Sequence, residues 1–270
     1  MKKLSLIIAL LVAGTLSYSQ NRETRSVDTF TRLSFRVSGK LYLKQGSPQK
    51  VELEGSKDLL SEIETKVDGD RLIIGKEGKW MDWNWHDNDK ITVYVTVKDI
   101  DAISVSGSGD LFGQGKFSTG NLKLNVSGSG SMEIEAEAHG DVEADVSGSG
   151  DVNLKGSCNN FNSDVSGSGK VVLSIAVRER VDFGLSGSGK IQAEGSAREV
   201  KTHISGSGKV LASNLEADKC DIRISGSGDV EINVKTDLDA TISGSGSVTY
   251  RGNPSHVNSH ASGSGSIRKM

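Results

Sequence analysis

The tetrapeptide Ser-Gly-Ser-Gly recurs throughout this chain, and its regular spacing limits the folds that the chain can adopt. Successive copies are 18 to 21 residues apart. They begin at Ser106, Ser127, Ser147, Ser166, Ser186, Ser205, Ser225, Ser243 and Ser262. A flexible Gly-Ser linker has no such regular interruption, whereas a fixed period of this length is typical of solenoid proteins. The repeat is therefore taken as the structural unit.

Apolar residues keep a constant phase around each motif. An alternating triplet such as Leu122, Leu124 and Val126 precedes it, and a polar residue followed by an apolar one, such as Val152, comes after it. Period-two alternation indicates strands with one buried face. A single coil cannot bury that face alone, so coils must stack, with parallel in-register strands about 4.8 Å apart. The pattern predicts an all-β parallel β-helix of about 20-residue coils, right-handed by the general preference of parallel crossovers.

The motif glycines allow two structural interpretations. They could point inward on a straight strand and let another wall pack close, or they could lie at a bend that needs a positive φ. The motif serines are expected to point outward and form ladders that hydrogen-bond between coils. The motif lacks the Lys-Ser/Thr of a phosphate-binding loop.

The first 100 residues divide into two parts. Residues 1–19 have a basic start and a short apolar run, followed by the small residues Ser17 and Ser19. This pattern predicts a signal peptide that is cleaved after Ser19 rather than a membrane anchor. Residues 20–100 are expected to form a less regular β region that covers the first coil, with residues 101–270 forming the repeat β-helix. In the first region, residues 33–43 have the phase of the repeat with one Ser-Gly deleted, Asp68-Gly69 indicates a turn, and Ser56 to Leu60 indicates one capped helical turn.

These residues carry a family resemblance. The segments Phe-x-x-Leu-x-Phe-x-Val-Ser-Gly (30–39), Val-Asp-Gly-Asp-Arg-Leu-Ile-Ile (67–74) and Ile-Ser-Val-Ser-Gly-Ser-Gly-Asp (103–110) resemble the head GIN domain family, whose members are described as adhesins. The resemblance covers nearly the whole chain after residue 19. It implies a β-helical fold and a periplasmic or cell-surface location, and it brings no catalytic residue.

Charge and composition limit the classes of molecule that the chain is expected to bind. The formal net charge of −3 gives no electrostatic case for nucleic acid or an anionic membrane, and no second apolar stretch suggests membrane insertion. A glycan or a cell-surface protein is the expected partner, with self-association through open solenoid ends as a further expectation. No cofactor is expected.

All three tryptophans lie within six residues, in a polar loop between two predicted strands. Trp80, Trp83 and Trp85, with Asn84, could form an aromatic platform for a sugar or a protein partner. Alternatively, one or more indoles could plug the end of the solenoid. The platform is the predicted binding site.

Carboxylates after the motif raise the alternative of a polysaccharide lyase or hydrolase. Asp110 and Asp151 are two coils apart, close to the carboxyl separation of an inverting glycosidase. Lys170, Lys190 and Lys209 occupy the same column, however, which favours a solvated charged ladder. The sequence therefore predicts a non-catalytic, adhesin-like scaffold or binding module.

Metal and disulfide sites are not expected. His203 and His260 are three coils apart, and the acidic stretch 82–89 lacks the spacing of an EF-hand. Cys158, expected in a corner, and Cys220, expected in an inward column, are also three coils apart, too far for a disulfide.

Overall fold

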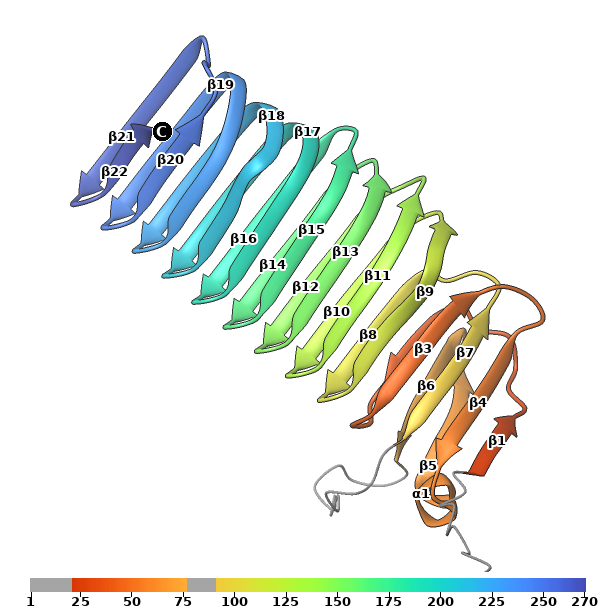
Figure 1. The fold of residues 1–270 in the computed structure, drawn as a ribbon. Coiled ribbons are helices and arrows are strands. Elements are labelled where there is room, and N and C mark those ends of the chain that lie inside the picture. Colours follow the sequence, from red (N-terminus) through yellow and green to blue (C-terminus); the bar gives the residue numbers. More distant parts are fainter. Residues whose placement is uncertain (1–20, 77–90) are drawn as a thin grey trace, which may run out of the picture.

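The computed structural model describes residues 21–76 and 91–270, and this part of the chain is almost entirely β-structure. Parallel strands stack into an elongated solenoid of about eight turns, and the short helix α1 (Lys57–Glu62) lies at its N-terminal end (Figure 1). The predicted fold class, a solenoid of about 20-residue coils, is confirmed.

Each regular coil has two strands, one before the motif and one after it. The strands before it make the pre-motif wall, and the strands after it make the post-motif wall. The first set is β8 (Ala102–Gly107), β10 (Leu122–Gly128), β12 (Val142–Gly148), β14 (Phe161–Gly167), β16 (Arg180–Gly187) and β21 (His256–Gly263). The second set is β9 (Asp110–Thr119), β11 (Ser131–Ala138), β13 (Asp151–Cys158), β15 (Lys170–Val177), β20 (Ser247–Arg251) and β22 (Ser266–Lys269). Three long strands continue from the second wall into the first: β17 (Lys190–Gly206), β18 (Lys209–Gly226) and β19 (Asp229–Gly244).

Pairing between coils is parallel and in register. Gly128 pairs with Gly148, and Gly148 pairs with Gly167, so equivalent motif positions lie directly above one another. The same register continues to Gly263. The prediction that the nine motifs stack in one column is confirmed.

The core lies between the two walls and is built from the alternating apolar positions. Val142, Ala144 and Val146 of β12 are buried, and so are Val152 and Leu154 of β13. Each coil contributes only a few such side chains, so burial of apolar area depends on the neighbouring coils.

Both interpretations of the motif glycines apply, one to each glycine. The first glycine of each motif is at the bend, as at Gly148, where φ is 111°. The second is buried and needs its missing side chain, because a Cβ at Gly150 would lie 2.5 Å from the Gly130 carbonyl oxygen. The motif therefore turns the chain and lets successive coils approach closely.

The motif serines do not form the expected hydroxyl ladder. In the part of the chain that the structure describes, the bonds between coils at the motif come from backbone groups, as when Ser149 N donates to Gly128 O at 2.9 Å. The serine hydroxyls point to solvent, and many of these residues, such as Ser168 and Ser188, are exposed. Backbone N–H and C=O groups already supply the hydrogen bonds between coils at this turn, so the serine hydroxyls are not needed for them.

The N-terminal region joins the solenoid through parallel strands and ends in antiparallel ones. Strand β2 (Arg32–Phe35) pairs with β6 (Arg71–Lys76) and β8, and β3 (Lys40–Gln45) pairs with β7 (Thr92–Val97) and β9. Beyond them, β4 (Lys50–Gly55) is antiparallel to β7 and to β1 (Asn21–Arg25), while β5 (Ile63–Asp68) forms a hairpin with β6. Helix α1 begins after Ser56, whose hydroxyl accepts from Leu59 N.

The expected Ser-Gly deletion in the first coil is wrong. Phe35 pairs with Val105 and Lys40 pairs with Asp110, so the same number of residues separates the two strands in both coils. Arg36 and Val37 therefore replace the first Ser-Gly. Val37 is fully buried and its φ is not positive, whereas the first glycine of every later motif has a positive φ, so the first coil turns with a different backbone conformation.

Candidate functional site

Outward side chains of the pre-motif wall form one polar surface, here called the pre-motif face. Because the strands are in register, equivalent positions form columns along the solenoid axis with a spacing of about 4.8 Å. Carboxylates, amides and cations alternate over the face. Its members are Lys123, Asn125, Glu143, Asp145, Asn162, Asp164, Asp182, Lys201, His203, Asp221, Arg223, Asp239 and Thr241.

Open hollows of 380 to 640 Å³ lie along the pre-motif face and its corner. One hollow of about 390 Å³ surrounds Gly184, which leaves a gap in a column between Asp164 and His203. Lys201 and Arg223 also line it. A hollow with both signs of charge can hydrogen-bond hydroxyl groups through donors and acceptors.

Asp145 is the most perturbed carboxyl group on this face. Its Oδ2 lies 3.6 Å from Lys123 Nζ, which also contacts Glu143 Oε1 at 2.7 Å. Burial raises the pKa of Asp145 to about 6, and the neighbouring Glu143 adds to the effect. Its Oδ1 is buried without a hydrogen-bond partner among the described residues. A carboxyl with such a pKa can act as a general acid, the feature that would favour an enzyme.

Asp145 is not placed as a general acid needs to be. It does not line the hollows of the pre-motif face described above. Its nearest carboxylate, Glu143, is engaged by the same Lys123 ammonium group. The three side chains make a compact ion cluster in which Lys123 of one coil contacts both carboxylates of the next.

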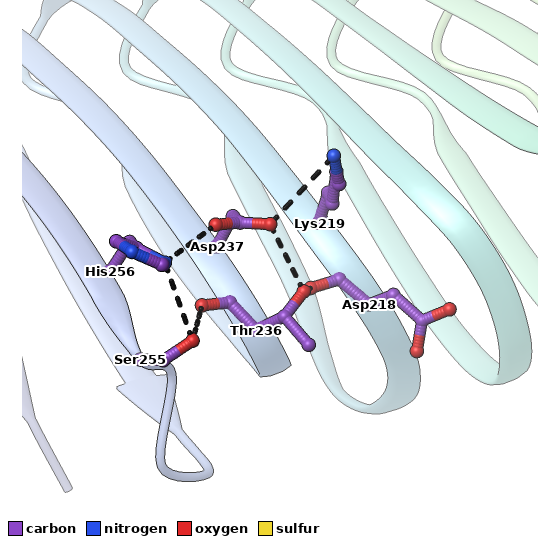
Figure 2. Close-up of polar contacts among 6 residues, drawn as sticks. All are labelled: Asp218, Lys219, Thr236, Asp237, Ser255 and His256. Carbon is purple, nitrogen blue, oxygen red and sulfur yellow. Dashed lines mark hydrogen bonds and ion pairs between the residues drawn. The ribbon is translucent and has the colours of Figure 1, made fainter.

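A corner of the solenoid brings serine, histidine and aspartate together (Figure 2). His256 Nδ1 lies 3.1 Å from Asp237 Oδ1 and 3.3 Å from Ser255 Oγ. Both contacts use one ring nitrogen, whereas a catalytic triad needs the aspartate at one nitrogen and the serine at the other. Ser255 Oγ also donates to Thr236 O at 3.2 Å, so the cluster ties one coil's corner to the next.

The charged column after the motifs is stacked as predicted. Register pairs Asp110 with Ser131 and Ser131 with Asp151, which places the two aspartates two coils apart. Ser131 Oγ donates to Asp110 Oδ1 at 2.6 Å, and Lys209 Nζ lies 2.8 Å from Asp229 Oδ2. Contacts within the column thus engage Asp110 and Asp229.

An aromatic stack on the post-motif wall was missed by the sequence analysis. The Tyr42 ring lies between Tyr94 and Phe112, with centroids 5.5 Å apart on both sides. The Arg22 guanidinium covers the other side of Tyr94 at 4.4 Å. Stacking hides ring faces, so the column presents mainly ring edges and fastens the N-terminal strands to the first coils.

The predicted tryptophan platform lies outside the described residues. This applies to Trp80, Trp83, Asn84 and Trp85, and also to the acidic stretch 82–89. His203 and His260 are exposed and three coils apart, as predicted. Across residues 21–76 and 91–270, no group of histidine, cysteine and acidic side chains is arranged to hold a metal ion.

The two cysteines are free, as predicted, and both are buried, although burial was expected only of Cys220. Cys220 lies between Val200 and Leu238 in an inward column. Cys158 is the last residue of β13 and faces the core, so the expectation that it lies in a corner is wrong. Burial raises the pKa of both thiols to about 12, which keeps them protonated and unreactive at neutral pH.

Comparison with known proteins identifies the family to which this solenoid belongs. The family model described as "Putative auto-transporter adhesin, head GIN domain" matches residues 29–174 and 167–254. The chain belongs to the head GIN domain family. No curated protein matches it. In the described parts of this head GIN chain, no helix is both long and apolar enough to cross a membrane.

Solved structures share the fold of the head GIN chain at low identity. A crystal structure from Parabacteroides distasonis, titled as a putative lipid binding protein, is 22% identical with a TM-score of 0.70, and the match covers 94% of this chain and 98% of that one. A structure titled as a putative adhesin from Parabacteroides merdae is 18% identical with a TM-score of 0.68, covering 94% and 97%. A Bacteroides fragilis structure, also titled as a putative adhesin, is 20% identical with a TM-score of 0.53, covering 94% and 98%. These likenesses show a common fold.

Proposed function

We propose that the chain is an extracytoplasmic, non-catalytic adhesin-like module that binds a glycan or a protein surface. The observation that carries the proposal is the pre-motif face, a rigid polar wall with open hollows. In-register strands hold its carboxylates, amides and cations in fixed columns, so little conformational entropy is lost when a ligand binds. The family description and the adhesin titles of the structural neighbours agree with this function.

Location at the cell surface or in the periplasm is part of the proposal. The basic start, apolar run and small residues of 1–19 support export and cleavage after Ser19. Peptide mass mapping of the protein purified from its native host should find Gln20 at the N-terminus. An N-terminus at Met1 on the exported protein would contradict cleavage.

We also propose that the tryptophan loop contributes to the contact site. Trp80, Trp83, Trp85 and Asn84 combine apolar rings with an amide, which suits a pyranose face and its hydroxyls. The competing interpretation is that these rings cap the solenoid. If the rings are exposed, replacing two of them should weaken binding and leave the fold intact. If they cap the solenoid, the same replacement should destabilise the fold.

The test uses residues 20–270 and the double variant Trp83→Ala, Trp85→Ala on a glycan array and on immobilised cell-surface proteins. We expect specific binding by the parent chain and loss of binding by the variant, with circular dichroism and melting temperature nearly unchanged. An unfolded variant supports the cap. A folded variant that binds as before places the site elsewhere, with the pre-motif face the next candidate.

The second candidate function is a polysaccharide lyase or hydrolase, and Asp145 is the observation that favours it. A general acid whose pKa is near 6 is suited to glycosidic bond cleavage. The ion cluster with Lys123 and Glu143 accounts for this carboxyl without catalysis. Measurement of reducing ends after incubation with polysaccharides separates the two functions.

A further inference from the structure

Three lysines occupy consecutive coils in the column after the motifs. Lys170 pairs with Lys190, and Lys190 pairs with Lys209, in register along β15, β17 and β18. Equivalent positions are about 4.8 Å apart, so three like charges follow one another over about 10 Å. Like charges directly opposite on neighbouring strands destabilise a sheet. We call Lys170, Lys190 and Lys209 the lysine ladder.

The lysine ladder is a longer run of like charge than the facing pair Asp221 and Asp239 on the other wall. Several neighbouring coils bring opposite charges together, as with Lys123 and Glu143 at 2.7 Å or Arg198 and Glu179 at 3.2 Å. Lys209 follows this pattern through Asp229 in the next coil. Lys170 and Lys190 form no ion pair with any residue in the described ranges. Positions that break a local rule without a compensating contact are expected at functional sites.

The surroundings of the ladder suit a ligand that is anionic and carries hydroxyls. The next outward column holds Val172, Gln192 and Leu211, so no acidic side chain lies beside the ladder in that column within the three lysine coils, and the first one, Glu231, follows in the coil after Lys209. On the other side, the column of Ser168, Ser188 and Ser207 exposes hydroxyls at the same coil spacing. Half-buried stems of Lys170 and Lys190 hold their charges close to the wall.

We infer that the lysine ladder binds a linear acidic polysaccharide lying along the solenoid axis. Carboxylate or sulfate groups on successive sugars would meet successive lysines, because the coil rise is close to the length of a pyranose unit. Serine hydroxyls would bond sugar hydroxyls, and Val172 and Leu211 would contact the apolar ring face. This inference rests on the proposed adhesin-like function and names its ligand class.

A flat anionic membrane fits this surface less well than a single polymer chain. The ladder is one side chain wide, and its column continues into Asp151 at one end and Asp229 at the other. Glu231 lies in the adjacent column beside Leu211. A membrane wide enough to reach the lysines would meet these carboxylates together with Glu231 in the adjacent column and be repelled, whereas a polymer chain bound over the three lysine coils meets Asp151 and Asp229 only at its two ends.

The test measures binding of residues 20–270 to polygalacturonate and to dextran sulfate, with neutral dextran as the polymer control. The variant is Lys170→Gln with Lys190→Gln. The matched control is Lys116→Gln with Lys155→Gln, which removes the same two charges on the same wall from positions on either side of Glu135 in one column. We expect the double variant to lose about tenfold or more in affinity, and the control to lose much less.

A stability measurement accompanies the binding assay. Without ligand at low salt, Lys190→Gln should raise the melting temperature because it removes like-charge repulsion, and the increase should shrink at high salt. Lys155→Gln should not raise it. A melting temperature for Lys190→Gln at or below that of the parent chain would overturn the repulsion argument.

Three binding results would overturn the inference. The first is equal loss of affinity in the ladder variant and in the control that removes two charges, Lys116→Gln with Lys155→Gln. The second is binding to phosphatidylglycerol vesicles without binding to either acidic polymer. The third is binding of array glycans or proteins but of neither acidic polymer. That result would contradict an acidic polysaccharide as the ligand of the ladder and would leave the proposed function intact. If the chain binds nothing in any assay, the proposed function fails as well.

Discussion

At the scale of single residues, the first glycine of each motif allows the coil to turn. Gly148 has a φ of 111°, and a Cβ there would lie 2.7 Å from the carbonyl oxygen of Gly128 in the preceding coil. Neither the backbone conformation nor the space tolerates a side chain. The cost of a substitution therefore combines strain with a steric clash.

Gly148→Ala is expected to lower the free energy of unfolding by roughly 1–3 kcal/mol. Gly120→Ala is the control, because nothing lies within 4 Å of a Cβ at Gly120 and its φ is not in the left-handed region. Urea denaturation followed by circular dichroism measures both. Equal stability of the two variants would show that the motif glycine is not required for the bend.

Asp145 should make stability depend on pH. Burial raises its pKa from 3.8 to about 6, so the folded chain holds this proton more tightly than the unfolded chain does. The corresponding stability is present at low pH and is lost as pH rises from about 4 to about 6. The asparagine in Asp145→Asn does not ionise, so the variant does not lose this stability as the pH rises.

We expect Asp145→Asn to be more stable than the parent chain at pH 8, by on the order of 1 kcal/mol, and to match it at pH 4. Thermal melts at the two pH values test this. A variant that is less stable at pH 8 would mean that the contact with Lys123 outweighs burial.

At the scale of elements, the coil is the unit that the chain can gain or lose. Gly148 pairs with Gly167, so removal of residues 149–167 joins equivalent positions and leaves the register unchanged. Each coil contacts mainly its neighbours, and stability is approximately a sum over coils.

A chain without residues 149–167 should fold, with β-type circular dichroism and a cooperative melt at a moderately lower temperature. Removal of residues 149–158 deletes β13 with its turn and joins a pre-motif bend to the wrong strand, so this variant should not fold. If both deletions fold equally well, the coil is not the structural unit.

The elements also show what a single sequence can predict. The stacked column followed from the motif period because every coil repeats the same turn. The first coil was harder, because Arg36 and Val37 stand in place of Ser-Gly and the same number of residues connects the two strands without a glycine at the bend. The stack of Tyr42, Tyr94 and Phe112 could not be predicted, since it depends on β3 lying between β7 and β9, and no sequence period encodes that pairing.

At the scale of the whole molecule, the solenoid presents long, straight surfaces rather than one enclosed cleft. The pre-motif face and the lysine ladder lie on different walls, and both run along the axis that is visible in Figure 1. Binding energy is then spread over many weak, repeated contacts, which suits attachment to a polymer or a surface. An enzyme would instead need carboxylates converging on one bond.

The central claim is that this surface binds its ligand without altering it. Size-exclusion chromatography with light scattering tests this directly, because it reports complex formation and polymer mass together. The chain should be incubated for hours with each of a panel of acidic and neutral polysaccharides, including polygalacturonate. We predict co-elution with an acidic polymer whose mass stays constant. A polymer mass that falls with time, or the absence of co-elution with every polymer, would contradict this account.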